Sequence, residues 1–269
     1  MFNRNHYLAR IGYEGSLEPS ADTLLALHRA HVRTVPFENL DIHLGRSISL
    51  EPDHLFRKVV QERRGGYCFE LNGLFALLLE EMGYSVTRLA ARVLYGAEGI
   101  RPRSHQVLLV RIDGEPWLAD VGFGGNGLLE PLYLSVGNER LQGIERFALS
   151  RDSRGEFLLQ CEIQGTWERL YSFPLDPYLP VDYIFANYFH SHSPDSPFTQ
   201  KRICTMPTEE GRKTFTDMVL KIRRNGKTEK VEARDEDEYR TLLREHFGLE
   251  EPGAFRKLPR HELHQRDAT

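Results

Sequence analysis

The chain has 269 residues, of which 40% are hydrophobic and 28% charged, with a net charge of −4. This composition is typical of a globular protein, and a pI near 6.3 gives no electrostatic reason to expect nucleic acid as a partner. No apolar stretch has signal-peptide or membrane-span length, and the three cysteines form no CxxC pair, so we predict no membrane partner and a reducing cytoplasm.

Three helices are predicted in the first third of the chain. Residues 20–33 and 51–63 carry apolar side chains at helical spacing, and each run begins with residues suited to a helix start. A third run follows over 68–83 and ends in a glycine, which is the usual C-terminal stop.

The pattern changes after residue 85. Residues 86–173 form short β runs separated by turn signals. Beyond a proline-rich join, residues 181–189 are predicted to be helical, and Asn225-Gly226 is a strong hairpin signal. A final helix is predicted over 235–247. The expected fold is therefore α+β, with a helical, a β and an α/β domain at residues 1–85, 86–180 and 181–269.

Cys68 stands where the glycine pair of RRGGYCFELN leads into a helix. We expect the two glycines to allow a sharp turn through backbone angles that are closed to other residues. A thiol in the first helical turn meets unpaired N–H groups and the positive end of the helix dipole, which favour the thiolate. A buried structural cysteine could occupy the same position, so a nucleophile also requires a base and a group that orients it.

Residues 104–123 supply both groups. Two β runs flank Asp113-Gly114, which is a two-residue hairpin signal. With this pair at the centre of the turn, Asp120 opposes Val107 and lies diagonal to His105 on the same face. A turn placed one residue pair earlier makes His105 and Asp120 directly opposed. Either register puts an imidazole beside a carboxylate, as a Cys–His–Asp triad requires.

Six motifs resemble those of the arylamine N-acetyltransferases, and in particular of the prokaryotic type. They are PFENL at 36–40, RGGYCFELN at 64–72, SHQVLL at 104–109, ADVGFG at 119–124, SPDSPFTQKR at 193–202 and LLREHFGL at 242–249. The first four occur in the order and spacing of the family, and the similarity covers nearly the whole chain.

The resemblance implies a fold and an activity. The fold is an N-terminal helical bundle, a central antiparallel β-barrel-like domain and a C-terminal α/β lid, around a Cys–His–Asp core like that of cysteine proteases. Cys68, His105 and Asp120 take the triad positions. Acetyl-CoA is the implied acetyl donor, and arylamines, arylhydrazines and N-hydroxyarylamines are the implied acceptors in a ping-pong reaction of xenobiotic metabolism.

The resemblance also assigns supporting residues. Arg64 and Glu38 form an ion pair that supports the active-site loop. The pocket and CoA positions are Phe37, Val93 and Phe123 for the acceptor and Gly124 and Gly125 for CoA.

Several other features are predicted to carry no chemistry. GFGGNG at 122–127 fits a dinucleotide-binding fingerprint, but β-type residues follow it where a helix is required, so we reject that site. Cys161 and Cys204 are expected to be inert. His190 and His192 have no third ligand at a recognised spacing, so no metal is expected.

Three alternative functions are compatible with these residues. A cysteine hydrolase or transglutaminase-like enzyme shares the Cys–His–Asp order. A non-catalytic CoA-binding or scaffold protein would not need an intact triad. A related amide synthase would act on a larger biosynthetic intermediate. The motifs do not specify the acceptor amine, the use of acyl groups longer than acetyl, or the oligomeric state.

Overall fold

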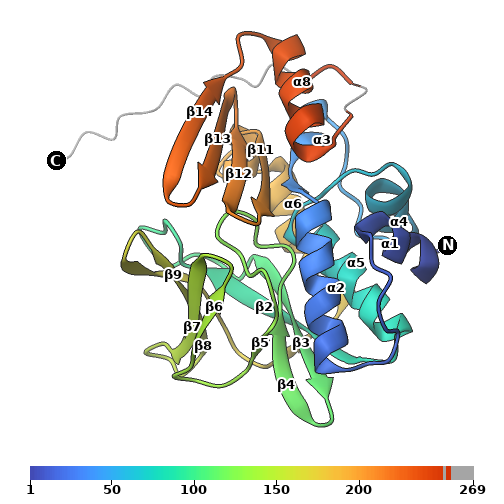
Figure 1. Ribbon diagram of the computed structural model, residues 1–269, viewed down its shortest axis with the longest axis vertical. Helices are drawn as coiled ribbons and strands as arrows, with labels where there is room; N and C mark the ends of the chain where they lie inside the picture. The colour runs from blue at the N-terminus through green and yellow to red at the C-terminus, as the bar shows by residue number, and fades with distance from the viewer. Residues whose placement is uncertain (251–252, 256–269) are drawn as a thin grey trace.

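The computed structural model describes residues 1–250 and 253–255 of the chain, so the end of the expected third domain lies outside the described residues. The N-terminal helices pack against one side of a large antiparallel sheet, and a second, smaller sheet lies at one end of both (Figure 1). The chain is thus α+β, as predicted.

The helical part surrounds one buried helix. Its elements are α1 (Arg4–Ile11), α2 (Ala21–Thr34), α3 (Leu40–Leu44), α4 (Pro52–Phe56), the π-helical turn η1 (Arg57–Gln61) and α5 (Cys68–Glu81). The three predicted helices are confirmed as α2, α4 with η1, and α5, whereas α1 and α3 were not predicted. Most side chains of α5 are buried, because this helix is apolar on nearly all sides and is enclosed by the others.

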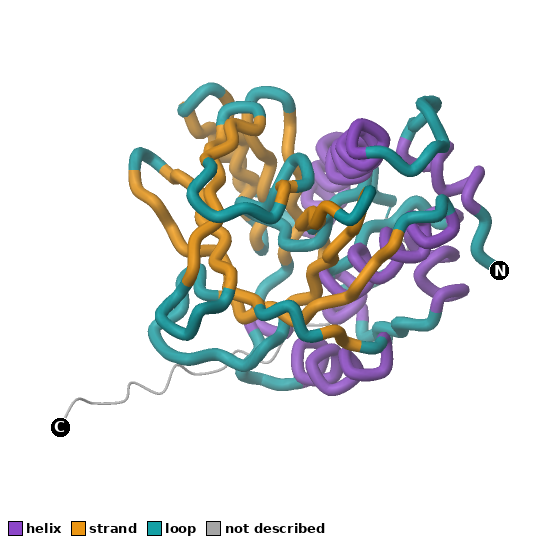
Figure 2. Tube along the Cα trace, turned by 90° about the horizontal axis from the view of Figure 1, so that it is seen from below, coloured by secondary structure: helices purple, strands orange, loops and turns teal. Residues whose placement is uncertain are grey.

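The large sheet curls into a nearly closed barrel. Its strands are β2 (Ser85–Val93), β3 (His105–Ile112), β4 (Glu115–Ala119), β5 (Leu132–Tyr133), β6 (Glu139–Gln142), β7 (Glu145–Arg151), β8 (Phe157–Ile163), β9 (Thr166–Phe173) and β10 (Pro177–Tyr178). They lie in the order β5-β4-β3-β2-β9-β8-β7-β6, and β10 pairs with β2. The first part of β2 pairs with β3 and its last two residues pair with β9, so β2 joins the two halves of the barrel. In Figure 2 the strands are orange, and most of the purple helices lie to one side of them.

The smaller sheet combines one strand from the N-terminal part of the chain with four strands from the last third. Its order is β1-β11-β12-β13-β14, formed by β1 (Phe37–Glu38), β11 (Ile203–Thr208), β12 (Gly211–Thr216), β13 (Val219–Arg224) and β14 (Lys227–Glu232). The predicted Asn225-Gly226 turn is confirmed between β13 and β14. The remaining elements are η2 (Pro180–Tyr183), α6 (Ile184–His192), α7 (Pro197–Gln200) and α8 (Glu236–Phe247).

Three clusters of buried apolar residues hold these layers together. One fills the helical part, one the barrel, and one the space between the smaller sheet and α8. The clusters cross the expected domain bounds: Leu108 of β3 belongs to the first, and Leu40 of α3 to the third. The division at residues 85 and 180 therefore stays a prediction.

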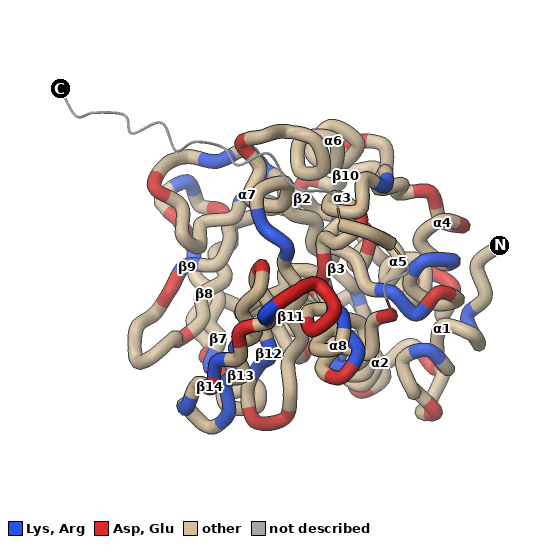
Figure 3. Tube along the Cα trace, turned by 90° about the horizontal axis from the view of Figure 1, so that it is seen from above, with Lys and Arg blue, Asp and Glu red and all other residues tan. Residues whose placement is uncertain are grey.

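Charge is spread over the molecule. In the view of Figure 3, segments with Lys and Arg are intermixed with segments with Asp and Glu. Among residues 1–250 and 253–255, no helix has the length and apolar character needed to cross a membrane.

Candidate active site

The β3–β4 hairpin has the first of the two predicted registers. Asp113 and Gly114 form the turn with φ of 52° and 84°, and Leu108 pairs with Ala119. This register places Asp120 diagonal to His105 on one face of the hairpin, as predicted. The His105 Nε2 and Asp120 Oδ2 atoms lie 2.7 Å apart, and both side chains are buried.

Cys68 is the first residue of α5 and lines a cavity together with His105. The helix start is closed by Glu70, whose Oε2 accepts a hydrogen bond of 3.0 Å from the Tyr67 N–H. The Cys68 Sγ donates a weak hydrogen bond to the Ser104 carbonyl oxygen at 3.9 Å. The thiol therefore lies where the helix dipole favours negative charge, within the same cavity as an imidazole.

The two glycines before Cys68 have a different role from the one expected. Neither has a left-handed φ, which occurs instead at Arg63 with φ 54°. A Cβ on Gly65 would lie 2.0 Å from the Pro36 carbonyl oxygen, and one on Gly66 would lie 2.8 Å from Glu70 Oε2. The glycines are required because the loop approaches β1 and the start of α5 closely, so the prediction of special backbone angles was wrong.

The charges of His105 and Asp120 stabilise each other. Burial alone would lower the pKa of His105, but the Asp120 carboxylate reverses this effect and raises that pKa to about 10. Burial opposes the charge of Asp120 as well, yet the neighbouring His105 and two hydrogen bonds keep the pKa of Asp120 below its usual value. The pair is therefore an imidazolium and a carboxylate at neutral pH.

Two residues that the sequence did not indicate hold Asp120 in place. Asn72 of α5 donates from Nδ2 to Asp120 Oδ1 at 2.8 Å and accepts from the Val121 N–H at 2.9 Å. His28 Nε2 accepts from the Asp120 N–H at 3.2 Å, and burial lowers the pKa of His28 to about 4, so this imidazole stays neutral. Both residues are far from Asp120 in sequence, and neither stands in a spacing that would point to this contact.

A cavity of about 530 Å³ opens in front of Cys68 and His105. Phe37, Val93 and Phe123, the expected pocket residues, all line it. Its size and its mainly apolar wall suit a small organic ligand.

The loop after β4 closes one side of this cavity. Gly122 packs against Cys68, because a Cβ there would lie 2.9 Å from the Cys68 Cα. Gly125 lines the cavity, whereas Gly124 does not and packs against the ring of Phe37. After the loop the chain enters β5, and no helix occurs between β4 and β5, as the rejection of a dinucleotide site requires.

The α6–α7 segment supplies another part of the cavity wall. Phe189, His190 and Phe198 line the cavity, although the sequence singled out none of them as site residues. The SPDSPFTQKR motif, which contains Phe198, was the available signal for this segment. The pair of histidines in α6 was considered only for metal binding.

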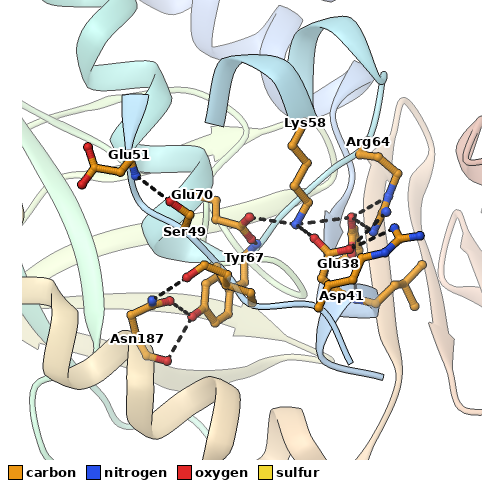
Figure 4. A network of polar contacts seen from close by, with 12 residues as sticks. Glu38, Asp41, Ser49, Glu51, Lys58, Arg64, Tyr67, Glu70 and Asn187 are labelled. Carbon is orange, nitrogen blue, oxygen red and sulfur yellow. Dashed lines mark hydrogen bonds and ion pairs between the residues drawn. The ribbon is translucent and has the colours of Figure 1, made fainter. Parts of the chain in front are cut away.

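A second group of buried charges lies behind the active-site loop, and Figure 4 shows its members. This charge cluster consists of Glu38, Asp41, Lys58, Arg64 and Glu70. Arg64 meets Glu38 at 2.8 Å, as the family resemblance implied, and the Lys58 Nζ lies 2.7 Å from both Asp41 and Glu70.

The charge cluster contains three carboxylates and two cations, and Arg46 contacts Asp41 from its edge at 3.5 Å. Burial and the two other carboxylates raise the pKa of Glu70 to about 7, even though Lys58 opposes the change. Lys58 faces all three carboxylates, which outweigh its burial and raise its pKa. Glu70 therefore binds its proton more tightly than an exposed carboxyl group does.

The other two cysteines are buried away from the cavity. Burial raises the pKa of Cys161 to about 12 and holds that of Cys204 well above its ordinary value. Within residues 1–250 and 253–255, no group of three or more His, Cys, Asp or Glu side chains could hold a metal ion.

The chain is similar to characterised proteins along most of its length. Residues 20–253 match a family model described as N-acetyltransferase. An arylamine N-acetyltransferase of Escherichia coli is 37% identical over 250 residues, covering 91% of this chain and 88% of that protein. A Salmonella typhimurium protein named arylamine N-acetyltransferase / N-hydroxyarylamine O-acetyltransferase is 34% identical over 90% of this chain and 87% of its own length.

A solved structure is similar over the same extent. The arylamine N-acetyltransferase of Mycobacterium marinum, determined in complex with CoA, superposes with a TM-score of 0.86. It is 34% identical to this chain, and the match covers 91% of this chain and 92% of that one.

Proposed function

The chain belongs to the arylamine N-acetyltransferase family, and we propose that it acetylates arylamines, arylhydrazines and N-hydroxyarylamines by a ping-pong mechanism through an acetyl-Cys68 intermediate. It is an acyltransferase, and the CoA complex of its relative supports acetyl-CoA as donor. The observation that carries the proposal is the 2.7 Å contact between His105 and Asp120 in the cavity that Cys68 lines.

In the first half-reaction, the Cys68 thiolate attacks the thioester carbonyl carbon of acetyl-CoA. The bond between that carbon and the CoA sulfur breaks, and CoA leaves with the proton of the His105 imidazolium. The product is an acetyl thioester on Cys68 and a neutral His105. Because one thioester replaces another, the exchange is nearly balanced in free energy.

In the second half-reaction, the amine nitrogen attacks the carbonyl carbon of acetyl-Cys68. His105 takes the proton that the nitrogen loses, and the Cys68 thiolate leaves. This step restores the thiolate–imidazolium pair. Asp120 holds the imidazole in one orientation through both half-reactions, and its own charge favours the imidazolium.

The remaining predicted residues receive supporting roles. Phe37, Val93 and Phe123 would contact the aromatic ring of the acceptor, since all three line the cavity. Gly125 would let CoA approach the loop closely, while Gly124 would act indirectly through Phe37. We assign the α6–α7 segment, part of the expected α/β lid, to the cavity wall on the side of Phe198.

The test separates the two half-reactions. The protein is mixed with acetyl-CoA and no amine, and intact mass and released CoA are measured. We expect the mass of one acetyl group on Cys68 and one CoA per chain, followed by loss of the adduct when an arylamine is added. Cys68→Ser should give neither signal while remaining folded, because a hydroxyl is far less acidic than a thiol.

Other outcomes would favour other functions. A folded protein that forms no adduct would contradict the acetyl-cysteine mechanism. An adduct that water removes as fast as an arylamine does would favour a hydrolase. Cys161 and Cys204 serve as internal controls, because their raised pKa values predict that neither is acetylated.

A further inference from the structure

His190 lies on α6 with its imidazole against the residue that precedes His105. Its Nε2 atom is 3.0 Å from the Ser104 carbonyl oxygen, and the side chain is buried. A carbonyl oxygen can only accept, so Nε2 must carry the proton of the neutral ring. The other nitrogen, Nδ1, is buried and has no hydrogen-bond partner among the described residues.

The same carbonyl oxygen is shared by two donors. The Cys68 Sγ approaches the Ser104 oxygen at 3.9 Å, and because a carbonyl oxygen has two lone pairs, the thiol and His190 both donate to it. An N–H group is a much stronger donor than a thiol. Once Cys68 is ionised, its sulfur faces the negative end of that carbonyl, and a donor bound to the oxygen weakens the repulsion.

We propose that His190 is a positioning residue for acetyl transfer. By donating to the Ser104 carbonyl, it withdraws electron density from the oxygen that faces the Cys68 sulfur, which makes that oxygen a weaker acceptor for the thiol proton and reduces its repulsion of the thiolate. The same bond fixes the backbone at the start of β3, from which His105 projects. This inference rests on the function proposed above, because it concerns the ionisation of the same thiol.

The surroundings keep His190 neutral, as this role requires. Burial lowers the pKa of His190, and the neighbouring His105 charge lowers it further. Protonation would also place a proton on Nδ1, where no acceptor is available among the described residues. The titratable groups around the ring are Cys68, His105 and Tyr67, and the same cavity is also lined by Tyr95, Arg101 and Asp195.

Other contacts anchor α6 independently of His190. The Tyr67 hydroxyl donates to the side chain of Asn187, whose Nδ2 donates to the Ile48 carbonyl oxygen at 3.0 Å (Figure 4). At the end of the helix, the Ser196 Oγ donates to the His190 carbonyl oxygen at 2.9 Å. A substitution of the His190 ring should therefore leave the helix in place.

The experiment compares three variants with the unaltered protein. His190→Phe keeps an aromatic ring but removes the donor, and His190→Gln keeps an N–H group near the position of Nε2. His192→Phe is the matched control, because His192 is an exposed histidine on the same helix. Each protein is assayed for the rate of Cys68 alkylation by iodoacetamide from pH 5 to 9, for CoA release in a single turnover, and for its melting temperature.

We expect His190→Phe to move the alkylation step upward by about one pH unit, which corresponds to a roughly tenfold slower acetylation below that step. His190→Gln should restore both readouts, and His192→Phe should change neither. A merely structural role would lower the melting temperature without a pH shift that the glutamine reverses.

Two results would overturn the inference. One is a folded His190→Phe protein with the alkylation profile of the unaltered enzyme. The other is a His190→Gln protein that behaves as His190→Phe does, since the ring rather than the donor would then matter. Failure of the proposed function looks different, because the unaltered protein itself would then form no acetyl-Cys68 and release no CoA.

Discussion

Two groups of buried charge flank the first turn of α5, and they differ in what their cations can do. On the cavity side, His105 and Asp120 form an ion pair beside Cys68. On the other side, the charge cluster surrounds Glu70, which lies two residues further along the same helix. The first pair contains an imidazole that gives up its proton and regains it during the proposed reaction, whereas Lys58 and Arg64 keep their charge.

The comparison shows how burial serves two purposes within one helical turn. A buried ion pair is costly in either place, because both charges lose their hydration. In the charge cluster, the ion pairs of Arg64 with Glu38 and Asp41 attach the loop that precedes Cys68 to β1 and α3. Beside the cavity, the ion pair with Asp120 holds His105, which donates and accepts protons in the proposed reaction, close to Cys68. The two groups should therefore respond differently to substitution, one in stability and the other in chemistry.

The largest effect is expected from Lys58→Met. This change leaves the Asp41 and Glu70 carboxylates without the cation that lies 2.7 Å from each. Breaking a buried ion pair typically costs about 3–5 kcal/mol, and we expect that loss in urea unfolding at pH 8, where Glu70 is ionised. Arg57→Met is the control, since Arg57 is exposed and should change stability by less than about 0.5 kcal/mol. A loss below about 1 kcal/mol would show that water or a proton replaces Lys58.

A smaller effect, on chemistry rather than stability, is expected from Asp120→Asn. Without the carboxylate, burial dominates and the pKa of His105 falls, so the thiolate–imidazolium pair loses its support. We expect kcat to fall by at least roughly 10², and the rise of Cys68 alkylation to move towards the pH of a free thiol, about 8.5.

The control for this substitution lies in the same hairpin. Asp113→Asn changes an exposed turn residue with φ 52°, a conformation that asparagine adopts readily, and should leave kcat unchanged. The melting temperature of Asp120→Asn must be measured as well, because Asn72 and Gly122 donate to the same carboxylate. A folded Asp120→Asn protein with near-normal turnover would mean that His105 is oriented by another group.

The smallest effect is expected from Glu70→Gln, which alters how stability depends on pH. The folded state raises the pKa of Glu70 to about 7, above its unfolded value, so it binds this proton more tightly than the unfolded chain does. The resulting stabilisation is complete below about pH 4.3 and is lost as the pH rises through about 7. Urea unfolding should show a decline of about 1 kcal/mol per pH unit from pH 5 to 7, which levels off towards pH 8 and is absent in Glu70→Gln.

The glutamine keeps the acceptor for the Tyr67 N–H, so the start of α5 should remain intact. Glu81→Gln, at an exposed position near the end of the same helix, should leave the pH slope as it is in the unaltered protein. Equal slopes in Glu70→Gln and the unaltered protein would place the extra proton of the charge cluster on another carboxylate.

Local signals in the sequence were enough to predict the structure on the cavity side of α5. The position of Cys68 at the start of α5 follows from helical periodicity, and the register of His105 with Asp120 follows from the Asp113-Gly114 turn. Both signals depend on residues close together in the chain, so both features could be predicted from the sequence. The order of helical, β and α/β parts was predictable for the same reason.

The contacts between side chains far apart in the sequence depend on the packed fold and could not be predicted. His28 and Asn72 reach Asp120 across 92 and 48 residues, and His190 reaches Ser104 across 86. The lack of room for a Cβ at Gly65 and the pKa of Glu70 likewise depend on what packs around them. Periodicity and turn chemistry describe neighbours along the chain, whereas close contact and loss of hydration exist only after the layers have packed together.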